Sequence, residues 1–427
     1  MATVVFYFQV HQPYRLRRYS VFDESGVYFD DEANERIVRK VADKCYRPAT
    51  RTLLEMVRAH DSNVRVAFSI SGTAMEQFRR WAPDVVELFR ELVGTGCCEL
   101  LCETTHHSLS FLYSRDEFVR QVLAHRRLMH EVFGVTPRVF RNTELTFSNE
   151  LAYFVSGLRD EDGAPLFDGM LCEGVDRHLG YRKPTYVYTP ATVDPARGGA
   201  PFGLLLKHYR LSDDIAFRFG NRAWEEWPLC AETFARWVHE INGDGYLCNL
   251  FMDYETFGEH QWRETGIFEF LRALPEKLFD LSPGENHFCT PSEALARFEP
   301  IGEYDVPEMT SWADTERDLS AWLGNAMQAN AQQELYKLER ALRDRLEGTG
   351  EDAEGVAELW RKLTTSDHAY YMCTKYFADG DVHKYFNPYD SPYDSYINFM
   401  NVLDHLRARL ERGSVVVRAG SGVPNSA

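Results

Sequence analysis

The stretch VVFYFQVHQP, residues 4–13, begins as an apolar run and ends in the tripeptide His-Gln-Pro, and six similar apolar runs follow before residue 260. Most of them are continuous rather than alternating, which is typical of strands buried on both faces. Long amphipathic patterns at Asn34–Ala59, Asp84–Val93 and Arg115–Phe133 indicate helices between the strands. Strand–helix alternation predicts parallel βαβ units and a closed or nearly closed barrel, although an open sheet gives a similar pattern. The runs are Val4–Val10, Val64–Ile70, Cys98–Cys102, Val139–Arg141, Gly169–Cys172, Gly203–Leu206 and Leu247–Met252.

Chemically active side chains come directly after four of these predicted strands. His11 follows the first, Glu103 to His107 follow the third, Glu144 follows the fourth, and Asp253 follows the seventh. In α/β barrels the carboxyl ends of the strands carry the active site. This repeated placement predicts an enzyme.

After Met252 the pattern becomes helical. Thr290-Pro291-Ser292-Glu293 has the form of a capping box with proline at the first helical position. We expect a catalytic barrel over residues 1–300, an α-helical domain over 301–412 that completes the active-site cleft, and a flexible tail over 413–427. The helices expected in the second domain are Arg317–Leu346, Glu354–Tyr376 and Pro392–Leu410.

The composition limits which partners and which cellular compartment we expect for the protein. The formal net charge of −18 repels phosphate backbones and argues against nucleic acid as a partner. The nine cysteines include no CxxC pair with metal-like spacing, which favours buried thiols in a reducing compartment. The N-terminal apolar run has no basic residues before it and is too short to span a membrane. We therefore expect a cytoplasmic protein.

Two carboxylates have the placement that glycoside hydrolysis requires. Glu144 lies in FRNTELTFSNEL beside Arg141, whose guanidinium would hold a carboxylate ionised, as suits a nucleophile. Asp253 ends an apolar strand in CNLFMDYETFGEHQW. Aromatic neighbours there would desolvate its carboxyl group and raise its pKa, so that it can act as a general acid near neutral pH. Two plainer interpretations stay open from spacing alone. In the first, Glu144 merely starts a helix that begins near Thr146; in the second, Asp253 lies in a solvated acidic loop.

Five segments in order resemble the signature regions of glycoside hydrolase family 57, with most similarity to its α-amylase branch. The match extends to DVHKYFNPYDSPYDSYINFMN, residues 381–401, and so covers nearly the whole chain. The five are HQP at 11–13, GCCELLCETTHHSLSFL at 96–112, RNTE at 141–144, DYETFGEH at 253–260 and SWADTERDLSAWLGN at 311–325.

This resemblance implies a (β/α)7 barrel followed by a helical domain, and a retaining mechanism on α-glucans or maltooligosaccharides. It places the nucleophile on Glu144 and the acid/base on Asp253. His11 and its neighbour Gln12 are expected at the cleavage subsite, and the acid of the second region falls on Glu99. Further substrate contacts are expected from His106, which the sequence does not separate from His107, and from Arg141, Trp262 and Trp312.

Other functions would use some of the same residues. A metal-dependent deacetylase-like enzyme would recruit His11, Asp253 and one of His106 and His107, but the sequence has no HxH or HxxxH element. We therefore expect no metal and no cofactor. An inactive glucan-binding protein would typically lack one of the two carboxylates. Hydrolysis and glucan transfer, as in a 4-α-glucanotransferase or a branching enzyme, share the same mechanism. The sequence does not distinguish hydrolysis from transfer, and it does not indicate the oligomeric state.

Overall fold

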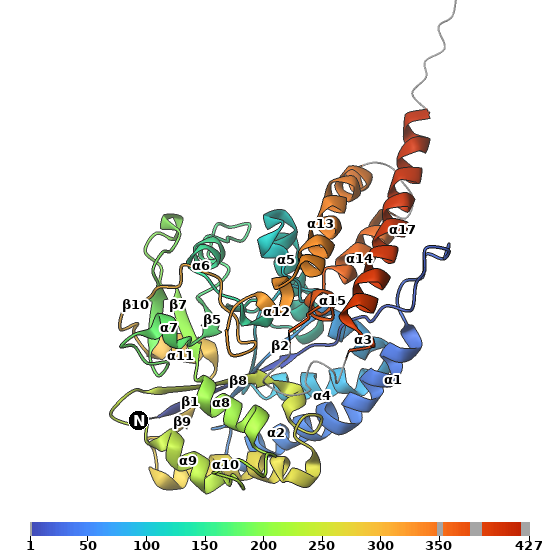
Figure 1. Ribbon diagram of the computed structural model, residues 1–427. Coiled ribbons are helices and arrows are strands. Elements are labelled where there is room, and N and C mark those ends of the chain that lie inside the picture. Colours follow the sequence, from blue (N-terminus) through green and yellow to red (C-terminus); the bar gives the residue numbers. More distant parts are fainter. Residues whose placement is uncertain (1, 348–352, 376–386, 420–427) are drawn as a thin grey trace, which may run out of the picture. The chain divides into compact units, whose positions relative to one another are not determined.

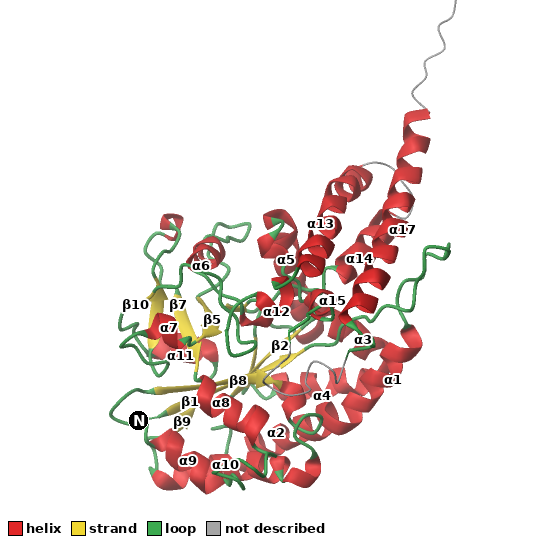
Figure 2. Cartoon of the chain, viewed as in Figure 1, coloured by secondary structure: helices red, strands yellow, loops and turns green. Residues whose placement is uncertain are grey.

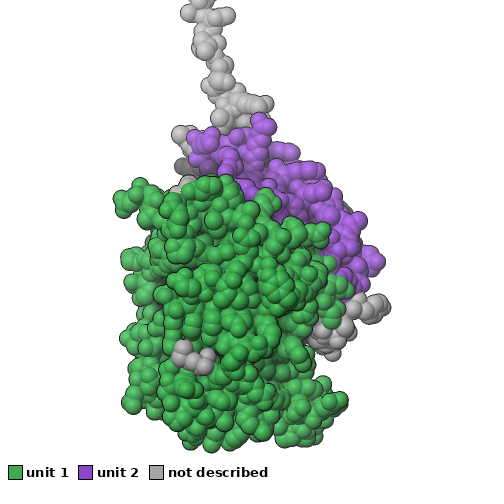
Figure 3. Space-filling view, turned by 90° about the vertical axis from the view of Figure 1, so that its left-hand side faces the viewer, with its two compact units in different colours: residues 1–12, 35–105, 119–319 green, residues 13–34, 106–118, 320–427 purple. Residues whose placement is uncertain are grey.

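The computed structural model describes residues 2–347, 353–375 and 387–419. Part of the segment 381–401, the end of the predicted helix at Tyr376, and residues 420–427 of the predicted tail lie outside this range. The chain forms two compact units, one of residues 1–12, 35–105 and 119–319, the other of 13–34, 106–118 and 320–427 (Figure 3). Among the described helices, none has the length and apolar character needed to cross a membrane.

The first unit is an α/β structure built on parallel strands (Figure 1). One sheet has the order β3–β2–β1–β8, with every pair parallel, and a short β9 also pairs with β1. The other has the order β10–β6–β7–β5–β4. The strands are β1 Thr3–Val10, β2 Val66–Ile70, β3 Cys98–Leu100, β4 Val139–Arg141, β5 Gly169–Glu173, β6 Val187–Pro190, β7 Gly203–Lys207, β8 Leu247–Asp253, β9 His287–Phe288 and β10 Glu303–Tyr304.

All seven apolar runs form strands, which confirms that prediction. Three strands were not predicted, namely the antiparallel β6 and the two-residue β9 and β10. Hydrogen bonds also link the two sheets. Cys102 N donates to Val139 O at 2.9 Å and Arg141 N donates to Cys102 O at 2.8 Å, while His208 N donates to Asn249 O at 2.8 Å.

Helices connect the strands as the pattern predicted, and their ends follow local rules. The capping box at Thr290 is present, with Pro291 opening helix α11. Ser71 caps α3, a helix not predicted, by accepting from Ala74 N at 3.2 Å. The helices up to residue 300 are α1 Asp31–Val41, α2 Arg47–Ala59, α3 Gly72–Trp81, α4 Pro83–Gly94, α5 Arg115–Phe133, α6 Asn149–Ser156, α7 Asp176–Leu179, α8 Tyr209–Asp213, α9 Ala231–His239, α10 Ile267–Leu281 and α11 Pro291–Arg297.

The second unit is helical over its C-terminal segment (Figure 2). Trp322 and Trp360 are fully buried within it, and α13 packs against both α14 and α17. The final helix runs to Ala419, further than the Leu410 that the sequence predicted. That this part of the chain completes the active-site cleft stays a prediction. Its helices are α12 Ser320–Leu323, α13 Ala326–Glu347, α14 Ala353–Leu363, α15 Ser366–Tyr370 and α17 Pro392–Ala419.

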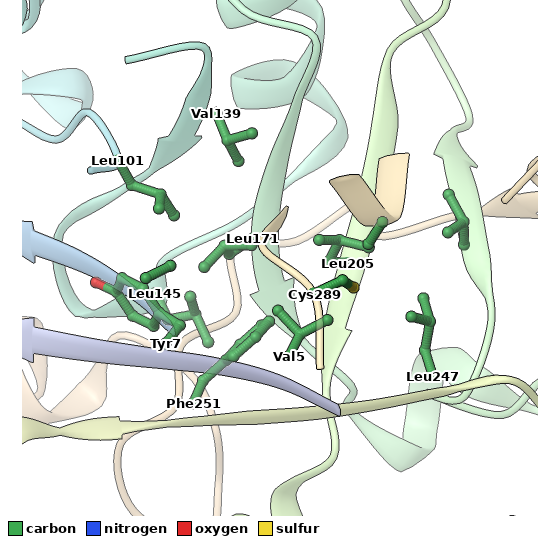
Figure 4. Packing of buried hydrophobic residues seen from close by; sticks show 13 residues of the cluster. Val5, Tyr7, Leu101, Val139, Leu145, Leu171, Leu205, Leu247, Phe251 and Cys289 are labelled. Carbon is green, nitrogen blue, oxygen red and sulfur yellow. The ribbon is translucent and has the colours of Figure 1, made fainter. Parts of the chain in front are cut away.

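A buried apolar cluster fills the space between the two sheets of the first unit (Figure 4). Each of the seven predicted strands, or its immediate extension, contributes a side chain to the cluster. Cys289 and Ala294 from the α11 region and Leu145 after β4 also belong to it. One residue from each predicted strand is Tyr7, Ala67, Leu101, Val139, Leu171, Leu205 and Phe251, and Val5, Val187 and Leu247 are further strand residues of the cluster.

Candidate active site

A layer of polar side chains lies one strand step beyond the apolar cluster. Because side chains alternate along a strand, the residue two positions after each cluster member points to the same side of its strand. In all seven strands that residue is polar or charged, and all but Asp253 are buried. The carboxyl ends of the strands therefore carry a layer of polar side chains. Its members are Gln9, Ser69, Glu103, Arg141, Glu173, Lys207 and Asp253.

Glu144 lies directly after β4, in a one-turn 3-10 helix of Thr143–Leu145. Its backbone is left-handed, with φ of 56°, and Leu145 follows with φ of 51°. Left-handed backbone is costly for residues other than glycine and concentrates at functional sites. The indole Nε1–H of Trp312 donates to Glu144 Oε2 at 3.0 Å. The turn thus presents this carboxylate at the polar layer with one oxygen held.

Arg141 and Glu103 form a buried ion pair beside this turn. The Nη1–Oε2 distance is 4.0 Å, and neither side chain is exposed. Gln9 Nε2 donates to Glu103 Oε1 at 3.1 Å, and Gln9 Oε1 accepts from Tyr7 Oη and from Ser69 Oγ, each at 2.7 Å. These contacts join four neighbouring strands through their side chains. They fix the orientation of Glu103, which the sequence had placed only in a loop after the third strand.

Asp253 ends β8 and pairs in register with Gln9 of β1. Two residues later, Glu255 is buried and accepts a short hydrogen bond from Tyr46 Oη, which in turn accepts from Gln12 Nε2 at 2.9 Å. Burial, with the negative charge of Asp253 as the next contribution, raises the pKa of Glu255 to about 8. The sequence had assigned desolvation to Asp253. In the structure Glu255, two residues further on, is buried, and Asp253 is half-buried.

This shift predicts how stability depends on pH. The pKa of Glu255 is higher in the folded protein than its ordinary value of 4.5, so folding favours the protonated form. Its stabilising contribution is present below about pH 4.5 and is lost as pH rises through about 8. The free energy of unfolding should be lower at pH 8.5 than at pH 5 by on the order of a few kcal/mol, and Glu255→Gln should remove this difference. Thermal unfolding of both proteins at the two pH values would measure it. Identical pH slopes for both proteins would contradict this prediction.

The two residues predicted at the cleavage subsite lie just past β1. The imidazole of His11 is half-buried, with Nδ1 at 2.8 Å from Ser71 Oγ. Gln12 is buried, and its amide supports Tyr46 as described above. His11 thus lies at the edge of the polar layer, whereas Gln12 contacts Glu255 indirectly, through Tyr46.

The structure does not bring Glu99 into the polar layer. Its carboxylate accepts from Ser292 N at 2.9 Å and from Ser292 Oγ, in the first turn of α11. Glu99 precedes Glu103 by four residues, which in an extended strand is about 13 Å toward the amino end. Glu103 is the acid of this region that reaches the layer, and its position directly after the predicted strand was the signal.

His106 and His107 belong to the second unit. His106 Nε2 lies 3.0 Å from Glu358 Oε1 of α14. Although burial raises the pKa of Glu358, the proximity of His106 and two further cations brings it below its ordinary value. His107 has a left-handed backbone with φ of 50°, and its carbonyl accepts from Ser366 N at 2.9 Å.

The two tryptophans predicted to stack on sugars differ in their surroundings. Trp262 is 56% exposed, and Lys44 Nζ lies 5.7 Å from its ring centre. An exposed indole at the loop after Asp253 is suited to stacking. Trp312 is partly buried and bonded to Glu144, so its indole N–H is already engaged.

A second charged group completes the polar layer, and sequence reasoning missed it. Glu173 of β5 is buried, with Oε2 at 2.8 Å from Arg317 Nη1 and 3.5 Å from Lys207 Nζ of β7. Lys207 also pairs with Asp213 at 3.1 Å. Burial raises the pKa of Glu173, and the two cations only partly oppose it. The signal was available, since Glu173 and Lys207 each come directly after a predicted strand.

Within the described residues, no group of three or more His, Cys, Asp and Glu side chains is placed to hold a metal ion. The nine cysteines are free thiols in the structure; seven are buried as predicted, whereas Cys98 is half-buried and Cys230 is exposed.

A family model and a related protein both place the chain in one family. Residues 5–307 match the family model described as glycosyl hydrolase family 57. The predicted fifth region, residues 311–325, lies beyond that match. A protein of Methanocaldococcus jannaschii named "Putative alpha-amylase" is 39% identical over 414 residues, which are 94% of this chain and 83% of that protein.

Two solved structures share the fold at low identity. The 4-alpha-glucanotransferase of Thermococcus litoralis has a TM-score of 0.66 at 14% identity, over 96% of this chain and 60% of that one. This chain thus spans about three fifths of that enzyme's length. The branching enzyme of Pyrococcus horikoshii has a TM-score of 0.65 at 15% identity, over 96% of this chain and 92% of that one.

Proposed function

The chain belongs to glycosyl hydrolase family 57, and from this premise we propose that it cleaves α-glucosidic bonds with retention, using Glu144 as nucleophile and Asp253 as general acid/base. One observation carries the proposal. Both carboxylates lie at carboxyl ends of strands, in or beside one polar layer above a shared apolar core. A carboxylate pair around one bond is what glycoside hydrolysis requires.

The proposed reaction has two displacements. Glu144 attacks the anomeric carbon and the glycosidic oxygen departs with a proton from Asp253, leaving a covalent glycosyl-enzyme. Asp253, now a carboxylate, takes a proton from the incoming water or sugar hydroxyl, whose oxygen displaces Glu144. The protein returns to its starting protonation state. Water as acceptor gives hydrolysis, and a glucan hydroxyl gives transfer.

We propose α-glucans or maltooligosaccharides as substrates, supported by the name of the M. jannaschii relative and the names of the two structural neighbours. His11 and Arg141 are proposed to contact sugar hydroxyls, and Trp262 to stack on a ring. None of the three side-chain nitrogens of Arg141 has a hydrogen-bond partner within the described chain, although the side chain is buried. Substrate hydroxyls or water would satisfy such donors. Products from maltoheptaose, amylose and pullulan would separate hydrolysis from transfer.

We also propose that the seven predicted strands close into a (β/α)7 barrel. The hydrogen bonds from Cys102 to β4, and from His208 to β8, support closure at both junctions between the sheets. In such a ring β4 and β8 have three strands between them on one side and two on the other, which places Glu144 and Asp253 on opposite arcs.

Product stereochemistry tests the proposal. A nucleophilic Glu144 requires the two carboxyl groups to lie about 5–5.5 Å apart and gives net retention, whereas inversion needs about 6.5–9.5 Å. Proton NMR of a maltooligosaccharide digest should show the α-anomer first, before mutarotation. A β-anomer appearing first would exclude the nucleophilic role, even if both carboxylates proved essential.

A further inference from the structure

Trp312 touches the proposed nucleophile at two points. Its indole Nε1–H donates to Glu144 Oε2 at 3.0 Å, and its main-chain N–H donates to Glu144 O at 3.3 Å. The side chain and the backbone of one glutamate are therefore held by one residue that is distant in sequence. We propose that Trp312 is a positioning residue that orients the nucleophile for attack. This inference rests on the proposed function of Glu144.

The backbone at Glu144 explains why such support is needed. Glu144 and Leu145 both have left-handed φ values, of 56° and 51°. Two successive residues in this region are unfavourable for amino acids with a side chain, so surrounding contacts must maintain the turn. The Trp312 N–H bond to Glu144 O supplies one contact, and the burial of Leu145 in the apolar cluster supplies another.

The ring of Trp312 is itself held by two cations. The guanidinium carbon of Arg141 lies 4.7 Å from the ring centre, and Lys207 Nζ lies 5.6 Å from it. These cations come from β4 and β7, which are not adjacent in their sheet. Lys207 is fixed in turn by Asp213 and Glu173. Cation–π contacts with anchored cations restrict the rotation of the indole and so aim its N–H.

The arrangement assigns different tasks to the two carboxylate oxygens. Oε2 receives the indole N–H, and Oε1 forms the bond to the anomeric carbon. The N–H bond also favours the ionised carboxylate, which is the nucleophilic form. Stacking of Trp312 on a sugar is a different role, because it would use the ring face and would act on substrate affinity.

Trp312→Phe tests the positioning role, because it keeps an aromatic ring and removes the N–H donor. We expect kcat on maltoheptaose to fall about 10- to 100-fold, the range for a hydrogen bond to a charged group, with KM changed less than about twofold. The acid limb of the kcat/KM profile should move upward by about one pH unit, since Glu144 loses a donor to its ionised form. Trp360→Phe is the matched control. It removes the bond from Trp360 Nε1 to Leu335 O, of 2.8 Å, in the second unit.

The outcomes separate this inference from the proposed function. Wild-type kcat and an unmoved acid limb in Trp312→Phe, with Glu144→Gln inactive, would overturn the positioning role and leave the nucleophile in place. A higher KM with unchanged kcat would show stacking instead, and would also overturn it. Activity in Glu144→Gln would refute the proposed function itself. An equal loss in Trp360→Phe would show that the effect is not specific to the site, and would overturn the inference too.

A measurement on the unaltered sequence covers the case in which Trp312→Phe does not fold. With 15N-labelled indoles, one Nε1–H resonance should move downfield as pH rises through the acid limb of the activity profile, because its acceptor ionises. That titration should disappear in Glu144→Gln while the other indole resonances stay in place. If no indole resonance follows the acid limb, the proposed bond does not operate in solution.

Discussion

Replacing Glu144 by glutamine is expected to lower kcat on soluble α-glucans by about four orders of magnitude or more, on the order of 5 kcal/mol in barrier. The amide keeps the shape of the side chain and can still accept the Trp312 bond at its oxygen, but it is a poor nucleophile. Substrate binding should persist, because the variant removes a group that acts in the transition state. Kinetics on soluble starch and calorimetry with maltoheptaose would measure the two effects.

Glu150→Gln is the matched control for this variant. Glu150 is an exposed glutamate six residues further on, in the first turn of α6. Its change should leave activity near the wild-type value. Near-normal activity of Glu144→Gln on soluble starch would remove the nucleophile assignment. Loss of binding together with turnover would indicate a damaged site rather than a missing nucleophile.

Replacing Asp253 by alanine should give a loss that depends on the leaving group. On unactivated glucans we expect about 10²- to 10⁴-fold lower rates, the usual contribution of general acid/base catalysis. Aryl glycosides with acidic phenols need little protonation, so glycosyl-enzyme formation should retain much more of its rate. The second step then becomes limiting, because no base activates water. A burst of phenol followed by a slow steady state would be the signature.

Azide provides a decisive extension, because it attacks without needing a base. With Asp253→Ala it should speed turnover and yield an α-glycosyl azide, since the covalent intermediate is still formed. With Glu144→Ala it would occupy the space of the missing carboxylate and yield the β-azide. Exchange of these two anomers would reverse the two assignments. Asp280→Ala, at an exposed aspartate of α10, controls for a nonspecific effect of losing an acid and should be neutral.

The strand positions could be read from the sequence because burial on both faces leaves a local mark. Runs such as Leu247–Met252 are continuous and apolar, and each of the seven formed a strand. β6 was not predicted, because Val187–Pro190 is short and contains Thr189 and Pro190. The discontinuous second unit, which draws on residues 13–34 and 106–118, is likewise a property of packing that no local pattern expresses.

Within the site, the sequence determined which strand ends have chemically active residues. It placed Glu144 directly after β4 and Asp253 at the end of β8, of which it is the last residue. Only the tertiary structure decided what those residues contact. Glu99 lies in β3 and Glu103 lies three residues after its end, yet one contacts α11 and the other belongs to the polar layer. Trp312, 168 residues from Glu144, donates its indole N–H to that carboxylate. The physical reason is that periodicity along a strand fixes the side on which a residue points, whereas its partners come from segments that only the folded chain brings together.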